Sequence, residues 1–250
     1  MREAVILVGA GLMAGAMNAL AGGGSFVSLP ALIAVGVPSV AANASSTVAL
    51  FPGGLASLWV YRRTAEPVCG VPLPVMAGLT LAGGLIGAAI LLSTPAALFD
   101  AILPWLLLTA TLALAFAQPL GEALRRRLRI GPAAVGAGQL LLGIYGGYFG
   151  GAVGLMMLAF WSLAAAGAEL KALQAPRTLL VTVANSAAVV WFALSGVVRW
   201  EAVAWLAPAG LAGGYLGALA GRRLGARHVR WATLALACAI TAAFFWRAYG

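Results

Sequence analysis

Gly22-Gly23-Gly24-Ser25 interrupts an otherwise apolar helical run, which reads Ala14-Gly15-Ala16-Met17-Asn18-Ala19-Leu20-Ala21-Gly22-Gly23-Gly24-Ser25-Phe26-Val27-Ser28-Leu29-Pro30. Consecutive glycines destabilise a helix and leave backbone groups without partners. In hydrocarbon, such groups are tolerated only where the chain is buried in protein or lines a wet cavity. A second glycine-rich break, Tyr145 to Gly154, occurs in the other half of the chain. Two breaks at matching places in two halves indicate a transporter binding site.

The composition is that of a membrane protein. Hydrophobic residues make up 63% of the 250 residues and charged residues 8%, and the mean hydropathy is +1.01. A soluble domain contains about a quarter charged residues, so we predict an all-α polytopic membrane protein with no separate soluble domain. The net charge of +9 comes mainly from arginines in short loops. We interpret them as topology determinants facing anionic lipid in the bilayer, and expect no nucleic-acid partner.

The apolar pattern predicts ten helical segments. Two of them, 25–36 and 152–166, are too short to cross a hydrocarbon core of about 30 Å at about 1.5 Å per residue. We interpret these two as half-helices that follow the glycine breaks. Because only Arg2 and Glu3 precede the first segment, we expect no cleaved signal peptide. The ten predicted segments are 4–20, 25–36, 41–61, 70–92, 98–118, 132–149, 152–166, 177–195, 201–221 and 229–247.

The chain contains an internal duplication. Gly83-Gly84-Leu85-Ile86-Gly87-Ala88 returns as Gly213-Gly214-Tyr215-Leu216-Gly217-Ala218, so residues 1–125 and 126–250 form two repeats of one transmembrane domain. The arginine clusters fall after the third and fifth segments of the first repeat, but after the fourth segment of the second. Since basic residues favour the cytoplasmic side, we predict that the repeats are inverted. Each would combine three transmembrane helices with a re-entrant helix pair, and both termini would lie outside.

No catalytic group is evident, and we expect neither an enzyme nor a bound cofactor or metal. The only histidine, His228, lies in an arginine cluster and is typical of a membrane interface. Cys69 and Cys238 are far apart in apolar contexts, which favours packing roles. All six acidic residues map to loops or helix ends, which argues against a proton relay inside the membrane. They are Glu3, Glu66, Asp100, Glu122, Glu169 and Glu201.

The two glycine breaks favour an anion. After Gly22-Gly23-Gly24, the N-terminus of the half-helix 25–36 presents free N–H groups and the positive end of the helix dipole, with Ser25 available as a cap. Gly150-Gly151 presents a second such end from the opposite side. Two converging helix N-termini would bind a small oxyanion.

Polar residues near these breaks have two interpretations each. The run Asn43-Ala44-Ser45-Ser46-Thr47, with its counterpart Gln174 to Thr178, either lines the site or caps helices at the membrane edge. Arg177 either extends to the cytoplasmic surface with Lys171 or turns inward to pair with the anion.

Other polar residues within the predicted spans are also ambiguous. Asn18, Asn185 and Ser186 either bond between helices or line the pathway, and Tyr145 and Tyr148 either donate to the anion or fill space beside glycines. The six glycines of the repeated motif are explained by close helix packing. The residues predicted to bind substrate are Asn18, Gly22, Gly23, Gly24, Ser25, Asn43, Ser46, Thr47, Tyr145, Tyr148, Gly150, Gly151, Arg177, Thr178 and Asn185.

The chain resembles the TauE/SafE sulfite exporter family. The run Gly15 to Ser25 with Pro30, then Ala42 to Thr47 and Arg62-Arg63, looks like that family's first repeat. The stretches from Gly143 to Gly154 and from Ala172 to Thr178 are similar to its second repeat. The resemblance implies a multi-pass transporter of the bacterial cytoplasmic (inner) membrane for small sulfur-containing anions.

These observations together predict a secondary transporter that exports a sulfur oxyanion, sulfite or an organosulfonate, by alternating access. Two alternatives remain open: a transporter for another small anion or a neutral solute, and a membrane assembly factor that transports nothing. The assembly factor would have glycine breaks that pack together without a site. The oligomeric state is left open, because contacts between protomers in a membrane are as apolar as lipid-facing surfaces.

Overall fold

The chain folds into a bundle of helices. The computed structural model describes residues 1–61, 67–125, 130–151, 153–164, 173–221 and 226–250. The ten predicted segments are confirmed as helices, and the described residues form no strand apart from an isolated bridge between Val68 and Val71. The helices are α1 (Arg2–Ala21), α2 (Ser25–Ala34), α3 (Ser39–Tyr61), α4 (Leu73–Ser93), α5 (Ala96–Arg125), α6 (Pro132–Tyr148), α7 (Val153–Ala164), α8 (Gln174–Ser195), α9 (Trp200–Gly221) and α10 (Ala226–Tyr249).

The helix lengths fit a polytopic membrane protein. Within the described part of the chain, five helices are long and apolar enough to cross a bilayer: α1, α4, α5, α8 and α10. The half-helices are short as predicted, with 10 residues in α2 and 12 in α7. Helix α8 begins at Gln174 and α10 at Ala226, three residues before their predicted starts, so Arg177 lies in the first turn of α8 rather than opening it.

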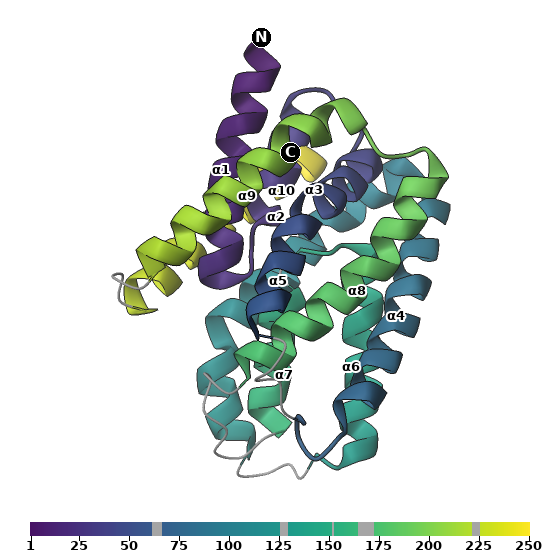
Figure 1. The fold of residues 1–250 in the computed structure, drawn as a ribbon, viewed down its shortest axis with the longest axis vertical. Helices are drawn as coiled ribbons and strands as arrows, with labels where there is room; N and C mark the ends of the chain where they lie inside the picture. Colours follow the sequence, from purple (N-terminus) through teal and green to yellow (C-terminus); the bar gives the residue numbers. More distant parts are fainter. Residues whose placement is uncertain (62–66, 126–129, 152, 165–172, 222–225) are drawn as a thin grey trace.

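Helices from the two halves of the chain pack together in crossed pairs. Helix α1 packs along α9, and α6 packs along α4; α3 lies against α8, and α5 against α10. Exchanging the halves therefore reproduces the same set of pairs. Figure 1 shows α1 and α2 toward the top of the molecule and α6 and α7 toward the bottom, with both termini in the upper part.

The crossed pairs depend on glycine. A Cβ added to Gly15 would overlap the carbonyl of Gly210 in α9, and one added to Gly87 would overlap the carbonyl of Ile144 in α6. A Cβ on Gly83 would lie 2.5 Å from the Leu140 oxygen, again a backbone group. Such approach is possible only where no side chain separates the helices.

The prediction that the repeated glycines serve close packing is confirmed at five of the six positions. A Cβ on Gly84, Gly213 or Gly217 would also meet backbone atoms of a facing helix at less than 3.0 Å. At Gly214 the nearest such atom, the Gly15 oxygen, is an ordinary 3.7 Å away. Gly214 is therefore in ordinary contact with α1 and does not make the close backbone approach of the other five glycines.

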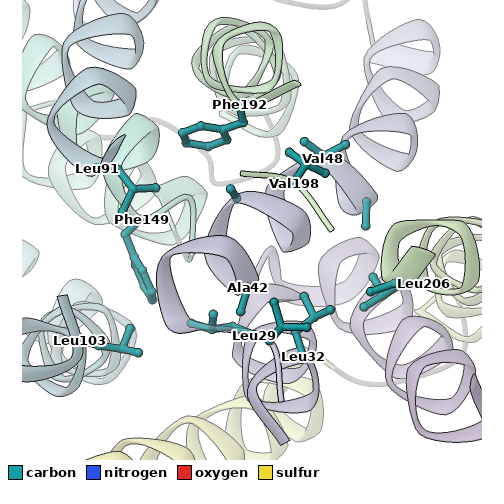
Figure 2. Packing of buried hydrophobic residues seen from close by; sticks show 14 of the residues in the cluster. Leu29, Leu32, Ala42, Val48, Leu91, Leu103, Phe149, Phe192, Val198 and Leu206 are labelled. Carbon is teal, nitrogen blue, oxygen red and sulfur yellow. The ribbon is translucent and has the colours of Figure 1, made fainter. Parts of the chain in front are cut away.

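Two hydrophobic clusters fill the interior. The larger one joins α2, α3, α5 and α9 to faces of α4 and α8, and in Figure 2 the Phe149 ring reaches into it near Leu91 and Leu103. The smaller cluster is formed by α4, α6, α7 and the start of α8, around the fully buried Trp161 and Met157. Helices α4, α6 and α7 and the start of α8 therefore share a separate hydrophobic core.

Most of the charges used to predict topology lie outside the described residues. These are Arg62, Arg63, Arg126, Arg127, Arg129, Arg222 and Arg223; Glu66, Glu169 and Lys171 also lie outside the described residues. Of the acidic residues, Glu3 and Glu201 lie in the first turns of α1 and α9, as expected for helix ends.

Candidate functional site

The first glycine break forms a tight turn between α1 and α2. Gly22 ends α1 in the left-handed region, with φ of +79°, and its N–H donates to the carbonyls of Asn18 (3.0 Å) and Met17 (3.1 Å). Helix α2 starts immediately, because the N–H of Phe26 donates to the Gly23 carbonyl. A helix N-terminus therefore follows the glycines, as predicted. We call Gly22-Gly23-Gly24 the first tip.

The predicted cap at this helix is wrong. The N-cap residue of α2 is Gly24 and not Ser25, and no side chain caps the helix. Ser25 is instead the first helical residue. The reason is that the chain already turns into the helix at Gly24, whose backbone has helical angles.

The second break has matching geometry. Gly150 follows α6 with φ of +70°, close to the +79° of Gly22, and the preceding Phe149 N–H donates to the Tyr145 carbonyl at 2.9 Å. Gly151 is buried, and a Cβ there would lie 2.6 Å from the Phe149 ring. We call Gly150-Gly151 the second tip. Each half of the chain thus has a left-handed glycine between its helix pair.

Arg177 lies between the two helix pairs. A Cβ on Gly22 would lie 3.3 Å from its Nη1 atom, and a Cβ on Gly154, near the start of α7, would lie 3.5 Å from its Cδ. The stem of Arg177 therefore passes α7 while its guanidinium reaches the first tip. Arg177 is half-buried, whereas Lys171, its partner in the surface interpretation, lies outside the described residues.

The polar run of α3 lies within that helix and is almost fully buried. Asn43 and Ser46 are 1% exposed and Thr47 5%. Since α3 begins at Ser39, these side chains do not cap a helix end. The residues are spaced so that all three share one side of α3.

The side chains of this run contact both helix pairs. Ser46 Oγ lies 2.6 Å from Ser28 Oγ of α2, and Asn43 Nδ2 donates to the Tyr148 carbonyl at the end of α6, at 2.9 Å. Thr47 faces the second tip, because a Cβ on Gly150 would lie 2.9 Å from its Oγ1. Its hydroxyl donates to the Asn43 carbonyl at 3.0 Å.

The remaining predicted polar residues lie in α1 and α8. Asn18 lies in the last turn of α1, with its Cβ 3.1 Å from a Cβ on Gly24. Thr178 follows Arg177, and its hydroxyl donates to the Gln174 carbonyl at 2.9 Å. Asn185 lies two turns further along α8, and its buried Oδ1 has no hydrogen-bond partner among the described residues.

The two tyrosines beside the second tip make contacts with α5. The Tyr145 hydroxyl donates to the Leu106 carbonyl at 3.1 Å, and the Tyr148 ring packs edge-on against Phe99 at 5.8 Å between centroids. Both side chains are therefore engaged in packing in this conformation.

Sequence reasoning missed Ser28 and a buried cluster around Gln139. Ser28 is fully buried and joins α2 to α3. This serine one turn after Gly24, inside an apolar half-helix, is the sequence feature that could have indicated this buried contact. The Gln139 amide of α6 donates to Thr80 of α4 at 2.7 Å and accepts from the Trp161 indole of α7 at 3.2 Å. In the described part of the chain, no three His, Cys, Asp or Glu side chains come together to hold a metal.

The fold and the site define an all-helical polytopic membrane protein with glycine-broken helix pairs around a buried polar run. A family model described as sulfite exporter TauE/SafE matches residues 7–244. The chain therefore belongs to the TauE/SafE sulfite exporter family and is a multi-pass membrane transporter of this type, which indicates transport rather than enzymatic catalysis.

Named relatives agree with this class. The chain is 32% identical over 216 residues to the probable membrane transporter protein YfcA of Escherichia coli (strain K12), covering 85% of this chain and 77% of the relative. It is 31% identical over 222 residues to the probable membrane transporter protein ORF9 of Sinorhizobium sp, covering 88% and 80%. A probable membrane transporter protein of Haemophilus influenzae is 28% identical over 223 residues, covering 85% and 83%. No solved structure matches the chain.

Proposed function

We propose that this protein is a secondary transporter that exports a small sulfur-containing oxyanion, sulfite or an organosulfonate, across the cytoplasmic membrane of a bacterium. The observation that carries the proposal is the place of Arg177, whose guanidinium lies beside Gly22 while its stem passes Gly154. The anion would bind where the cation meets the first tip. The family description supports the choice of a sulfur oxyanion.

The chemistry of this region suits a small oxyanion. A guanidinium offers several N–H donors in a fixed planar arrangement, and hydrogen bonds to a charged oxygen are stronger than neutral ones. The start of α2 adds backbone N–H groups and the positive end of its dipole. On the other side, α3 supplies Ser46 and Thr47 close to the two tips.

The proposed architecture is a pair of inverted repeats, residues 1–125 and 126–250, with a re-entrant helix pair in each. Its support is the crossed packing of α1 with α9 and of α6 with α4, together with the similar φ angles of Gly22 and Gly150. The two tips would enter from opposite faces. Alternating access would expose the site between them to each side in turn.

The direction of transport follows from the charge of the substrate. A potential that is negative inside favours anion efflux by about 2.3 kcal/mol per charge per 100 mV. No separate coupling ion is therefore needed, and Glu3 and Glu201 lie in the first turns of α1 and α9, at helix ends. Export of a monovalent anion would respond directly to the membrane potential.

Transport assays in proteoliposomes test this function. Purified protein is reconstituted with sulfite, a short alkanesulfonate or thiosulfate inside, and a potassium gradient with valinomycin sets the potential. The proposal predicts efflux of at least one of these anions, faster at inside-negative potential, and none from liposomes without protein. If none of the three moves or binds, the sulfur substrate is refuted, and the alternatives of another solute or a membrane assembly factor are favoured.

A further inference from the structure

The helices divide into two units that do not coincide with the repeats. The α1–α9 unit consists of α1, α2, α3 and α9; the α4–α6 unit consists of α4, α6, α7 and α8. Each unit takes three helices from one half of the chain and one, α9 or α4, from the other. The backbone approaches at Gly15 and Gly87 join α1 to α9 and α6 to α4 so closely that neither pair can slide without steric overlap.

Buried polar contacts strengthen each unit internally. In the α4–α6 unit, Gln139 bonds to Thr80 of α4 and Trp161 of α7, and the smaller hydrophobic cluster surrounds them. In the α1–α9 unit, Ser28 and Ser46 join α2 to α3. The Arg199 N–H, just before α9, donates to the buried Ser45 Oγ of α3 at 2.8 Å.

The contacts between the units run through side chains, and the larger hydrophobic cluster extends across them. Helices α3 and α8 face each other across the interface, where a Cβ on Gly54 would lie at an ordinary 3.5 Å from Thr182 Oγ1. The contacts of both tips also cross this interface: Arg177 to Gly22, and Asn43 to the Tyr148 carbonyl.

We propose that transport moves these two units against each other, and that Asn43 is the positioning residue that sets the second tip from the opposite unit; this inference rests on the proposed function. Asn43 belongs to α3, yet its amide donates to Tyr148, two residues before Gly150. The carbonyl of a C-terminal helix residue has no partner within its helix. The Asn43 amide donates a hydrogen bond to the Tyr148 carbonyl while the two units are in contact. This hydrogen bond breaks when the units move apart.

Two disulfides test which contacts move, in a Cys69→Ser/Cys238→Ser background. Gly146→Cys/Ala184→Cys links α6 to α8 inside the α4–α6 unit, where a Cβ on Gly146 would lie 3.4 Å from the Ala184 Cβ. Gly54→Cys/Thr182→Cys links α3 to α8 across the interface. The Gly146 and Ala184 positions are close to the Cβ–Cβ separation of a disulfide, and the Gly54 and Thr182 positions are in direct contact. After oxidation we expect the first pair to keep transport within about twofold and the second to lose it about tenfold or more, with recovery on reduction.

The opposite pattern, or equal loss in both pairs, overturns the inference. If neither reduced pair transports any tested anion, the proposed function has failed, and the units are tested without transport. Spin labels on Val5 and Leu216, both exposed and within one unit, should give a single distance distribution. Labels on Leu216 and Leu141, in different units, should give two populations. One unchanging population for the second pair would also overturn the inference.

Asn43→Ala tests the positioning residue. We expect its turnover rate to fall about tenfold while KM changes less than about twofold, because the side chain holds the tip rather than the anion. The population ratio of the Leu216–Leu141 labels should shift as well. Ser45→Ala is the matched control, since it removes a buried α3 contact inside one unit. Equal label populations in Asn43→Ala and Ser45→Ala would contradict the assignment.

Discussion

The guanidinium of Arg177 lies against Gly22, so that a Cβ on this glycine would be 3.3 Å from Nη1. The two residues are separated by more than half of the chain and belong to opposite halves of it. At the equivalent place in the other half, Thr47 lies 2.9 Å from a Cβ on Gly150. Two similar tips therefore meet different side chains, a cation beside the first and a hydroxyl beside the second.

Gly22→Ala should abolish most transport. The new Cβ would crowd the Arg177 guanidinium, and the left-handed φ of +79° costs a non-glycine residue about 1–2 kcal/mol. The matched control is Gly196→Ala, which has a φ of +73° and nothing within 4 Å. Both variants should lose similar thermal stability in detergent, but only Gly22→Ala should lose transport. Equal transport by the two variants would show that the geometry of the first tip is not required for transport.

Gly87→Ala should destabilise the fold through the α4–α6 pair. Its methyl group would overlap the Ile144 carbonyl, and overpacking of this kind costs about 1–3 kcal/mol. Gly78→Ala, in the same helix with nothing within 4 Å, should be neutral or stabilise by up to about 1 kcal/mol. Thermal unfolding followed by circular dichroism compares the two. A higher Tm for Gly87→Ala than for Gly78→Ala would refute the close packing.

Ser28→Ala should destabilise by about 1–3 kcal/mol, because it leaves the buried Ser46 hydroxyl without its partner; Ser46→Ala should cost less, because the Ser28 hydroxyl keeps the Gly24 carbonyl at 3.3 Å. The double variant should cost clearly less than the sum of the two single changes. Ser93→Ala, which removes an exposed hydroxyl bonded to Ala89, is the control and should change little. Unfolding free energies from a double-mutant cycle measure the coupling; simple additivity would show that the two serines act independently.

A reporter fused after Gly250 tests the inverted topology. Because the arginine-rich loops are expected in the cytoplasm, both termini should lie outside. Alkaline phosphatase, active only outside the cytoplasm, should be active there, whereas a fluorescent protein that folds only in the cytoplasm should remain dark. An inactive phosphatase and a bright fluorescent protein would place the C-terminus in the cytoplasm and contradict the inverted topology. Thiol labelling of cysteines in 93–97 and in 222–228 should give opposite accessibility.

The helices were predictable because their signals are local. Apolar runs between glycines and arginines located all ten, and the short length of α2 and α7 followed from the distance between one break and the next polar run. The close packing at Gly83 and Gly87 was also predictable, since small residues at helical spacing have few other uses in a membrane.

The partners of the site residues were not predictable from spacing. The contact of Arg177 with Gly22 joins residues from opposite halves of the chain, so no local pattern predicts it. The Ser25 cap failed because the choice of N-cap depends on the φ and ψ of Gly24. The tyrosines beside Gly150 had a plausible binding role, but Tyr145 meets a carbonyl of α5, a contact that only the tertiary fold creates.

The affinity of the purified protein for sulfite, measured by titration calorimetry in detergent, tests the central claim most directly. A hydrogen bond to a charged group contributes about 1.5–3 kcal/mol, so Arg177→Gln should raise the Kd about tenfold to a hundredfold. Arg247→Gln, which removes an arginine from the last turn of α10, should leave the Kd unchanged. Sulfite binding by a folded Arg177→Gln protein with the native Kd would contradict an anion site between Arg177 and Gly22.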